Sequence, residues 1–299
     1  MERSLMTFNV LNAWTPNSSV YRTASKRSEQ AAEFVKRELP DILCLQEFDY
    51  YYRHHGSFIE GISDEYAEAD TRDELAGNGW NAIFYRKDKY SVIESGGWNF
   101  VENGFGIVPI KPAEGEIPPT RHSNCHEYRY PEDSEEGRAG IHRTRFRSLG
   151  WALLEDRDGE RIIVATTHFS LRSSCQPEES NFVLGRLWEL KEKYQCRIIV
   201  CGDFNSNCQT KGSAAARLLE ERFFDTYDMA EKRDDVATCH PSSGKGVSSE
   251  TDRMPGGSYK PHAIDHIFTD SEMAVKCFRI YAEQELLSVS DHCPVMIDF

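Results

Sequence analysis

The sequence predicts an α/β fold in which two mixed β-sheets pack face to face, with helices on their outer sides. Short apolar runs of strand-like composition recur along most of the 299 residues. Some runs are joined by tight polar turns typical of hairpins, and others by stretches with the apolar periodicity of helices. A chain that combines hairpins with helical crossovers is expected to form mixed sheets covered by helices.

The first predicted elements are a strand, a helix and a second strand. Residues 5–10 form an apolar run that ends near an asparagine. Residues 25–39 place their apolar side chains at helical spacing, and Pro40 ends the pattern. Residues 41–46 are almost continuously apolar, as expected for a strand that is covered on both faces.

The middle of the chain adds two predicted hairpins. Residues 81–85 and 90–93 flank the charged sequence Arg-Lys-Asp-Lys. Residues 149–154 and 161–165 flank a turn that contains Asp-Gly, one of the strongest short-range hairpin signals.

Two further helices are predicted over residues 178–194 and 213–222, the first with an apolar side suited to packing on a sheet. Two long stretches of little periodicity, near residues 96–147 and 242–261, are expected to be elaborated loops. Neither is bounded by a second apolar core, so residues 1–299 are predicted to form a single domain.

The composition favours a globular chain with a sizeable core and no membrane span. Hydrophobic residues make up 39% of the sequence and aromatic residues 11%. No run approaches the roughly 18 apolar residues of a transmembrane helix, and the first strand begins too early for a signal peptide. The nine cysteines show no Cys-x-x-Cys spacing, which favours reduced thiols over a disulfide framework or a zinc site. A cytoplasmic location is therefore expected, with secretion after removal of a leader as the minority alternative.

The formal net charge of −14 argues against a housekeeping DNA nuclease, because a non-specific duplex binder needs a basic surface. An acidic chain also repels a phosphate substrate at long range. Local cations, either a metal ion or arginines, must then offset that field. Arginines do cluster between residues 138 and 147, where a local basic rim could form.

Polar side chains of a catalytic type follow several of the predicted strands. Residues 197–201 are followed by Gly-Asp-Phe-Asn, which contains Asp203 and Asn205, and Asp291 and His292 are adjacent near the C-terminus. Residues i and i+2 of a strand point to the same face, so Asp203 and Asn205 are expected to project into one cleft. Carboxylate, amide and imidazole groups can hold a hard divalent cation and move protons at a phosphate.

Six such segments, in this order, resemble the endonuclease/exonuclease/phosphatase superfamily of DNase I-like phosphoesterases. The matching residues are Asn9 in Phe-Asn, Glu47 in Leu-Gln-Glu, His168 in Thr-His, Asp203 and Asn205 in Gly-Asp-Phe-Asn, Asp265 in Ile-Asp-His-Ile-Phe, and Asp291 and His292 in Ser-Asp-His. Each motif alone is a weak signal, whereas six in order over residues 5–299 are specific. The resemblance implies a four-layer α/β/β/α sandwich with its site along one rim of strand ends.

The resemblance implies a bound Mg²⁺ ion, which Mn²⁺ could replace, with Glu47 as its first ligand and Asn9 and Asp291 adjacent. The alternative for Glu47 is a surface carboxylate at a strand end, which the other five motifs make the weaker reading. Asp203 is expected to orient or deprotonate the attacking water. Asn205 is expected to hold a phosphoryl oxygen or a second metal, and it could also cap a helix.

His292 and Asp265 are expected to form a pair in which the carboxylate fixes the tautomer and favours the protonated ring. His168 is expected to be a second donor to the phosphoryl group, with a purely structural histidine as its alternative. His266 follows Asp265 in the same predicted strand. It should therefore face the opposite way, and we expect it to be structural.

One position departs from the nuclease pattern. Many nuclease members carry a glutamate where residues 78–81 of this chain are Asn-Gly-Trp-Asn. Asn81 is expected to contact the phosphate or His168 instead. Arg145 precedes the strand predicted at residues 149–154 and is a further candidate for phosphate binding, with a solvated basic loop as its alternative.

The expected function is hydrolysis of a phosphodiester by metal-assisted attack of water, of the nuclease or phosphodiesterase type. Hydrolysis of phosphomonoesters on inositol, lipid or small-molecule substrates is the first alternative, and a catalytically inactive binding scaffold is the second. The expected partner is thus a phosphate ester, either a nucleic acid or a small or lipid phosphate. No obligate protein partner is inferred.

Overall fold

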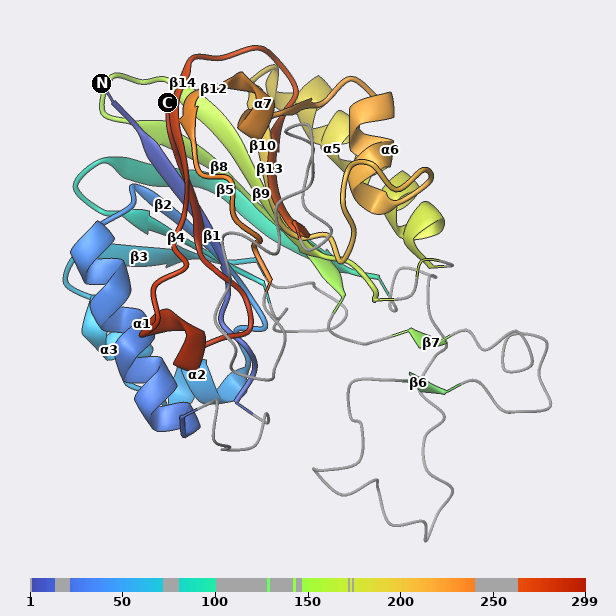
Figure 1. Cartoon of the computed structure of the whole chain (residues 1–299). Coiled ribbons are helices and arrows are strands. Elements are labelled where there is room, and N and C mark those ends of the chain that lie inside the picture. Colours follow the sequence, from blue (N-terminus) through green and yellow to red (C-terminus); the bar gives the residue numbers. More distant parts are fainter. Residues whose placement is uncertain are drawn as a thin grey trace, which may run out of the picture.

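Two large β-sheets lie face to face in the computed structural model, and helices cover their outer sides (Figure 1). The structure describes residues 2–13, 22–71, 81–100, 128–129, 142–143, 147–171, 173, 175–239 and 263–299.

The first sheet has seven strands in the order β12-β14-β15-β1-β2-β4-β3. They are β1 (Ser4–Asn9), β2 (Ile42–Gln46), β3 (Tyr66–Ala69), β4 (Ala82–Arg86), β12 (Ala230–Arg233), β14 (Val275–Ile280) and β15 (Val295–Asp298). The central strands β1 and β2 run parallel, because helix α1 (Ala24–Glu38) carries the chain back between them. Asn9 therefore lies level with Gln46, and both strands end at the same edge of the sheet.

The second sheet has six strands in the order β11-β13-β10-β9-β8-β5. They are β5 (Tyr90–Asn99), β8 (Ser148–Asp156), β9 (Arg161–His168), β10 (Arg197–Asp203), β11 (Phe224–Asp225) and β13 (Asp265–Thr269). Strands β9 and β10 run parallel, joined through helix α5 (Gln176–Tyr194), and their register places His168 level with Asp203. Strand β13 is antiparallel to β10 and pairs Asp265 with Asp203. A separate two-stranded piece consists of β6 (Tyr128–Arg129) and β7 (His142–Arg143).

Apolar side chains form three interior layers. The layer between the two sheets includes Ile42 and Ile199, while Phe8 lies in the layer beneath α1 and α3 (Phe58–Ile62) and Val200 in the layer beneath α5 and α6 (Ala214–Glu220). Alternate residues of a strand thus serve two different interiors, which explains why these strands are apolar without interruption. The shorter helices are α2 (Tyr50–His54), α7 (Thr226–Met229) and the 3₁₀ turn η2 (Leu286–Ser288). The predicted α/β/β/α sandwich is confirmed.

The hairpin predicted across residues 81–93 is wrong. Strand β4 pairs with β2 and β3 in the first sheet, whereas β5 pairs with β8 in the second. Both edges of β4 are already occupied, so the chain that leaves it through the turn at Arg86 must cross to the other sheet. A tight turn shows that two strands are close along the chain, and it does not decide which sheet each one joins.

Most other element predictions are confirmed. The hairpin over residues 149–165 is formed by β8 and β9, and the helices predicted at residues 25–39, 178–194 and 213–222 are α1, α5 and α6. Most of the predicted loops near 96–147 and 242–261 lie outside the described residues. Within the described part of the chain, no helix combines the length and apolarity needed to cross a membrane.

Candidate active site

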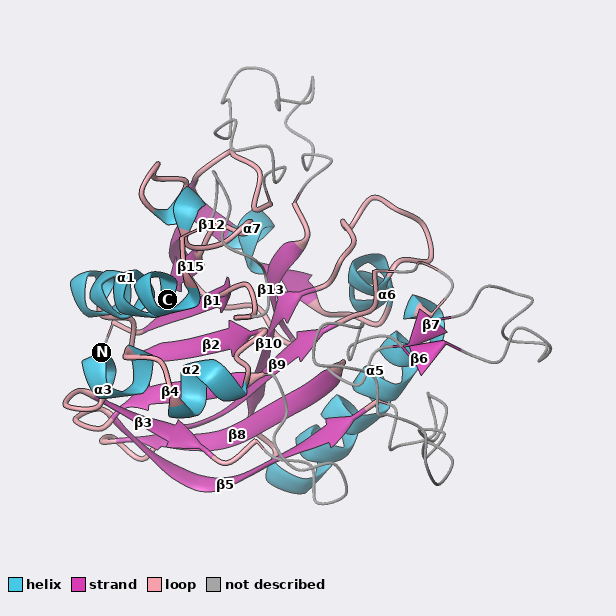
Figure 2. Cartoon of the chain, turned by 90° about the horizontal axis from the view of Figure 1, so that it is seen from below, coloured by secondary structure: helices cyan, strands magenta, loops and turns pink. Residues whose placement is uncertain are grey.

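Strand ends from both sheets bring the predicted site residues together. Strands β1 and β2 of one sheet and β9 and β10 of the other run toward the same side of the molecule (Figure 2). Asn9, His168 and Asp203 are the last residues of β1, β9 and β10, and Glu47 directly follows β2. Asp265 opens the antiparallel β13, and Asp291 and His292 lie just before β15, so these residues reach the same place from the opposite chain direction.

Asp203 is the centre of this cluster. Its Oδ2 atom lies 3.0 Å from His168 Nε2 and 3.5 Å from His292 Nε2, and it accepts a 3.0 Å hydrogen bond from Asn9 Nδ2. Its Oδ1 atom accepts a 2.8 Å bond from the backbone N–H of Asn205. The Asn9 bond joins the two sheets directly, because Asn9 belongs to the first sheet and Asp203 to the second.

The surroundings of Asp203 keep it ionised. Burial acts to raise the pKa of its carboxyl group, but His168, His292 and the guanidinium of Arg147 together hold the pKa well below the ordinary value. A carboxylate with such a low pKa retains a proton poorly. It is therefore suited to orienting hydrogen-bond donors and a water molecule.

Glu47 is held beside this centre in a left-handed backbone conformation, with φ of 56°. Its side chain accepts a 2.9 Å hydrogen bond from the backbone N–H of Asn12, another from the Asn12 side chain, and a 3.3 Å bond from Asn9 Nδ2. Burial acts to raise the pKa of Glu47, yet His168, the Asn12 amide and Arg147 outweigh burial and lower it. Non-glycine residues with positive φ are costly and concentrate at functional sites, and Leu11 and Asn205 share this conformation here.

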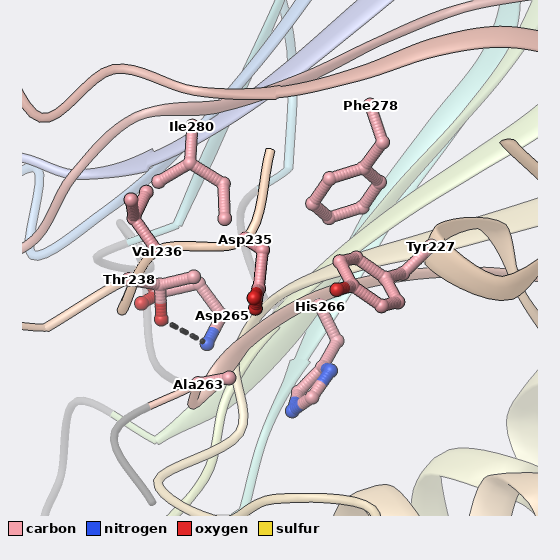
Figure 3. Close-up of a pocket in the computed structure, with 9 residues that line it drawn as sticks. All are labelled: Tyr227, Asp235, Val236, Thr238, Ala263, Asp265, His266, Phe278 and Ile280. Carbon is pink, nitrogen blue, oxygen red and sulfur yellow. Dashed lines mark hydrogen bonds between the residues drawn. The ribbon is translucent and has the colours of Figure 1, made fainter. Parts of the chain in front are cut away.

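His292 and Asp265 form the expected imidazole–carboxylate pair. The Nδ1 atom of His292 lies 2.9 Å from Asp265 Oδ2, and the backbone N–H of Asp265 donates to Thr238 Oγ1 at 3.1 Å (Figure 3). Burial raises the pKa of Asp265 in spite of this contact. Burial acts to lower the pKa of His292, but Asp265 and Asp203 raise it well above the ordinary value. The ring is thus positioned to act as a cationic donor at neutral pH.

A cavity of about 20 Å³ lies behind this pair, lined by Tyr227, Phe278 and Ile280 together with Asp265 and His266 (Figure 3). That volume corresponds to about one water molecule. It is too small for a substrate.

Asn205 does not lie in a strand. Strand β10 ends at Asp203, and Asn205 adopts φ of 47° while its Nδ2 atom donates a 2.8 Å bond to the carbonyl of Phe169. The expectation that residues i and i+2 project into one cleft from an extended strand therefore fails at this position. The side chain instead ties the turn after β10 to the turn after β9, and it caps none of the helices in the described part of the chain.

Asn81 is held by Ser148. Its Nδ2 atom donates to the carbonyl and to the hydroxyl of Ser148, at 2.8 and 3.0 Å. Its Oδ1 atom is buried and accepts no hydrogen bond from the described residues. Among those residues, the structure shows no hydrogen bond between Asn81 and His168. Arg145 and residues 78–80 lie outside the described part of the chain.

Two arginines support the site, and sequence reasoning missed one of them. Arg147, rather than the selected Arg145, is the described arginine whose charge acts on both Glu47 and Asp203. Arg27 is fully buried, and its guanidinium donates to the backbone carbonyls of Leu11 and Asn12 at 2.6 and 3.0 Å. The sequence feature that could have identified Arg27 is its position four residues before Ala31. This spacing puts Arg27 on the apolar side of helix α1.

Gly202 allows the two parallel strands of the second sheet to approach beside the site. Its φ of 141° lies outside the range of ordinary L-residues, and a Cβ atom there would lie 2.0 Å from the carbonyl oxygen of Thr167. Any side chain at this position would separate the strand ends that carry His168 and Asp203.

The donor set fits a hard divalent cation. Asp291 Oδ1 is buried, accepts no hydrogen bond from the described residues, and lies 4.0 Å from His292 Nε2. Glu47 Oε1 accepts only the long bond from Asn9 among the described contacts. Oxygen atoms with spare lone pairs in an anionic, buried setting are the ligands that Mg²⁺ prefers. Asp203, Asp265 and His292 also lie close enough together to hold an ion, but their facing atoms already contact one another.

Comparison with solved structures finds the same fold. An endonuclease/exonuclease/phosphatase family protein from Bacteroides thetaiotaomicron is 19% identical, with a TM-score of 0.69 over 100% of this chain and 97% of that one. A mannosyl-6-phosphatase from the same species is also 19% identical, with a TM-score of 0.61 over 99% and 98%. The catalytic domain of human Nocturnin with bound sulfate is 15% identical, with a TM-score of 0.62 over 99% and 93%.

Comparison with curated protein sequences gives no match. The sequence model of the Endonuclease/Exonuclease/phosphatase family, in contrast, matches residues 6–292, which is nearly the whole chain. The chain therefore belongs to the endonuclease/exonuclease/phosphatase family.

Proposed function

We propose that this protein is a Mg²⁺-dependent phosphodiesterase that hydrolyses its substrate by direct attack of water, without a covalent intermediate. Members of the family are hydrolases of phosphate esters and typically use divalent metals. The observation that carries the proposal is the convergence of Asn9, Glu47, His168, Asp203, Asp265, Asp291 and His292 from both sheets into one cluster.

Glu47 and Asp291 would hold the metal ion, with Asn9 next to them. When bound, Mg²⁺ or Mn²⁺ would neutralise phosphate charge and polarise the phosphorus–oxygen bonds. The protein supplies the rigid frame for these ligands. Asn12 holds the carboxylate of Glu47, and Arg27 holds the turn that carries Asn12.

Asp203 would orient the attacking water, because its carboxylate stays ionised and is already surrounded by fixed donors. His168 and His292 both face the same oxygen of Asp203. When a phosphoryl group is bound, these rings would donate to its oxygens and stabilise the charge that develops in the transition state. The protonated His292 is also placed to give a proton to a leaving oxygen.

The substrate class remains the open part of the proposal. A structure with the same fold is named a mannosyl-6-phosphatase and another is the catalytic domain of Nocturnin, so the fold serves differing substrates. His292 could supply a proton to the alkoxide leaving group of a diester or of a monoester, so the paired assay below decides between the two classes. A phosphomonoester of inositol, lipid or sugar type is the alternative. Among the described side chains, Asn81 and Arg147 are the candidates for binding its phosphate group.

The test is a metal-dependent assay with paired substrates. Chelator-treated protein is supplied with Mg²⁺, Mn²⁺ or EDTA and given bis(p-nitrophenyl) phosphate and p-nitrophenyl phosphate, followed by panels of oligonucleotides, inositol phosphates and lipid phosphates. We expect turnover with Mg²⁺ or Mn²⁺, none with EDTA, and a higher kcat/KM for the diester. Preference for the monoester would replace the diester proposal with the alternative.

Glu47→Gln separates catalysis from a binding scaffold. It keeps the shape of the side chain and removes its charge, so we expect metal-dependent turnover to be lost while the circular dichroism spectrum is kept. The matched control is Asp270→Asn, which changes a buried carboxylate at the opposite end of β10. Absence of turnover on every phosphate ester with every metal in the wild type would favour the scaffold.

A further inference from the structure

A second cluster of metal-binding side chains lies outside the proposed active site. It consists of Cys208, Asp225 and His266, whose ligand atoms all lie within 4.8 Å of one another. His266 follows Asp265 in β13, and successive strand residues face opposite sides, so His266 points away from the catalytic cluster. His266 therefore faces away from the catalytic residues, as expected. It lies beside Cys208 and Asp225, and the three side chains together could bind a metal ion.

The spacing of the three ligand atoms matches a tetrahedral metal site. The Sγ atom of Cys208 lies 3.4 Å from Asp225 Oδ2 and 3.8 Å from His266 Nδ1, and those two atoms are 3.6 Å apart. Tetrahedral zinc with its usual bond lengths to sulfur, nitrogen and oxygen separates such ligands by roughly 3.3–3.6 Å. Burial acts to lower the pKa of His266, but Cys208 and Asp225 raise it, so an incoming ion would replace existing contacts among the three side chains.

The His266 ring is fixed in the orientation that metal ligation requires. Its Nε2 atom lies 3.0 Å from the carbonyl oxygen of Ser206, which can only accept a hydrogen bond, so Nε2 carries the proton and Nδ1 faces the cluster. A backbone carbonyl on the far nitrogen is the usual outer partner of a metal-bound histidine. The ring also stacks on Phe268 and meets Phe204 edge-on.

The two carboxylate oxygens of Asp225 have different partners. Its Oδ1 atom accepts a 2.9 Å bond from the backbone N–H of Tyr227 and so caps α7, whereas its Oδ2 atom faces Cys208 and His266. This arrangement presents a single carboxylate oxygen to the cluster. Cys208 is only partly buried, which leaves a route to solvent for an incoming ion and a water as fourth ligand.

We propose that Cys208, Asp225 and His266 bind Zn²⁺ behind the active site, with three protein ligands and a water in the fourth position. Binding forms bonds from zinc to the Cys208 sulfur, the His266 Nδ1 nitrogen and an Asp225 oxygen, and it releases the thiol proton and the proton held on Nδ1 to solvent. The thiolate and imidazole select a softer ion than the all-oxygen donors around Glu47, so the two sites would take different metals. The absence of Cys-x-x-Cys spacing does not exclude this site, because it uses one cysteine.

The position of this site suggests that a bound ion would help to fix the positions of active-site residues. Cys208 lies in the turn that follows Asp203, and His266 is adjacent to Asp265. A bound ion would tie that turn to β13 and β11. It would thereby fix two carboxylates of the catalytic cluster without touching the substrate.

Cobalt provides a direct test, because a thiolate bound to Co²⁺ gives a charge-transfer band in the near ultraviolet. The chelator-treated full chain, kept reduced with a phosphine, is titrated with Co²⁺ in the Glu47→Gln background, where the proposed magnesium site is impaired. We expect the band to saturate at equimolar Co²⁺ and to disappear when Zn²⁺ is added. No thiolate band at equimolar Co²⁺ would overturn the proposal, whatever the activity of the enzyme.

Two variants assign the ligands. Cys208→Ser should abolish the band, while Cys196→Ser, which changes a partly buried thiol at the start of β10, should leave it unchanged. Asp225→Asn keeps the helix cap and should weaken Co²⁺ binding on the order of tenfold or more. A band that persists in Cys208→Ser, or Co²⁺ affinity unaltered in Asp225→Asn, would contradict the assignment. Circular dichroism checks that each variant is folded.

Discussion

Asp203 is a buried carboxylate whose ionised form depends on the donor groups around it. Four donor groups converge on one carboxylate, from Asn9, His168, His292 and the backbone of Asn205. Removing one of these donors would leave the buried carboxylate with less compensation, which is costly. The cluster is therefore expected to respond to substitution as a unit, with effects that do not add.

Asp203→Asn tests the centre of the cluster. The amide keeps the size of the side chain but cannot orient donors as a carboxylate does, so kcat should fall on the order of 10²–10⁴-fold. Initial rates at saturating metal, with circular dichroism as a check on folding, measure the effect. Asp270→Asn should retain activity within a few-fold, and a near-normal rate for Asp203→Asn would remove Asp203 from the mechanism.

Asp265→Asn tests the protonation of His292. Asp265 is the strongest of the groups that raise the pKa of His292 against the lowering effect of burial. Its neutralisation should move the alkaline limb of the kcat/KM profile to lower pH. An unchanged alkaline limb would mean that His292 does not set it. The profile is measured at saturating Mg²⁺ in wild type and variant.

The raised pKa of His292 also determines how the free energy of unfolding changes with pH. Because the pKa of His292 is raised in the folded state, its contribution is fully present below the unfolded value of about 6.5 and is lost as pH rises through the folded value. The pKa of Asp203 is lowered, so its contribution is present above the unfolded value of about 3.9 and is lost only in stronger acid. Urea unfolding of His292→Asn should therefore show less loss of stability at alkaline pH than the wild type.

At the scale of elements, local pattern predicted the strands better than it predicted their partners. The apolar runs marked β1, β2, β9, β10 and β13 because each is buried on both faces. The assignment of β4 and β5 to different sheets depends on β3 filling the free edge of β4, which no local pattern reveals. The left-handed turn at Asn205 was missed for a similar reason, since its amide is committed to Phe169, distant in sequence.

The close approach of β9 and β10 gives a prediction about Gly202. In Gly202→Ala, the new Cβ atom would meet the Thr167 carbonyl and the backbone would be strained, so unfolding free energy should fall by about 3 kcal/mol or more. Denaturant unfolding measures the change. Gly185→Ala is the matched control, because its Cβ would meet nothing within 4 Å on the exposed side of α5. This control should stabilise the helix by roughly 0.5–1 kcal/mol.

At the scale of the whole molecule, the site lies across the junction of the two sheets. The fully buried Gln46 of the first sheet donates to Thr166 of the second at 2.9 Å, close beneath the bond between Asn9 and Asp203. The order of the motifs along the chain was enough to predict that these residues converge. It could not identify Arg27, which belongs to no motif and acts through distant contacts, and it placed Arg147 only within the basic stretch before β8. The single-domain organisation of residues 1–299 stays a prediction.

The net charge of −14 leads to a final prediction about salt. An acidic surface repels an anionic diester at long range, and raising ionic strength from about 0.01 M to about 0.15 M shortens the screening length from about 30 Å to about 8 Å. At saturating metal, kcat/KM should therefore rise by a factor of about two or more, while kcat, which starts from the bound state, stays constant. A basic nuclease shows the opposite trend because salt weakens its phosphate contacts. A fall in kcat/KM with salt would mean that local cations such as Arg147 dominate the field that the substrate meets.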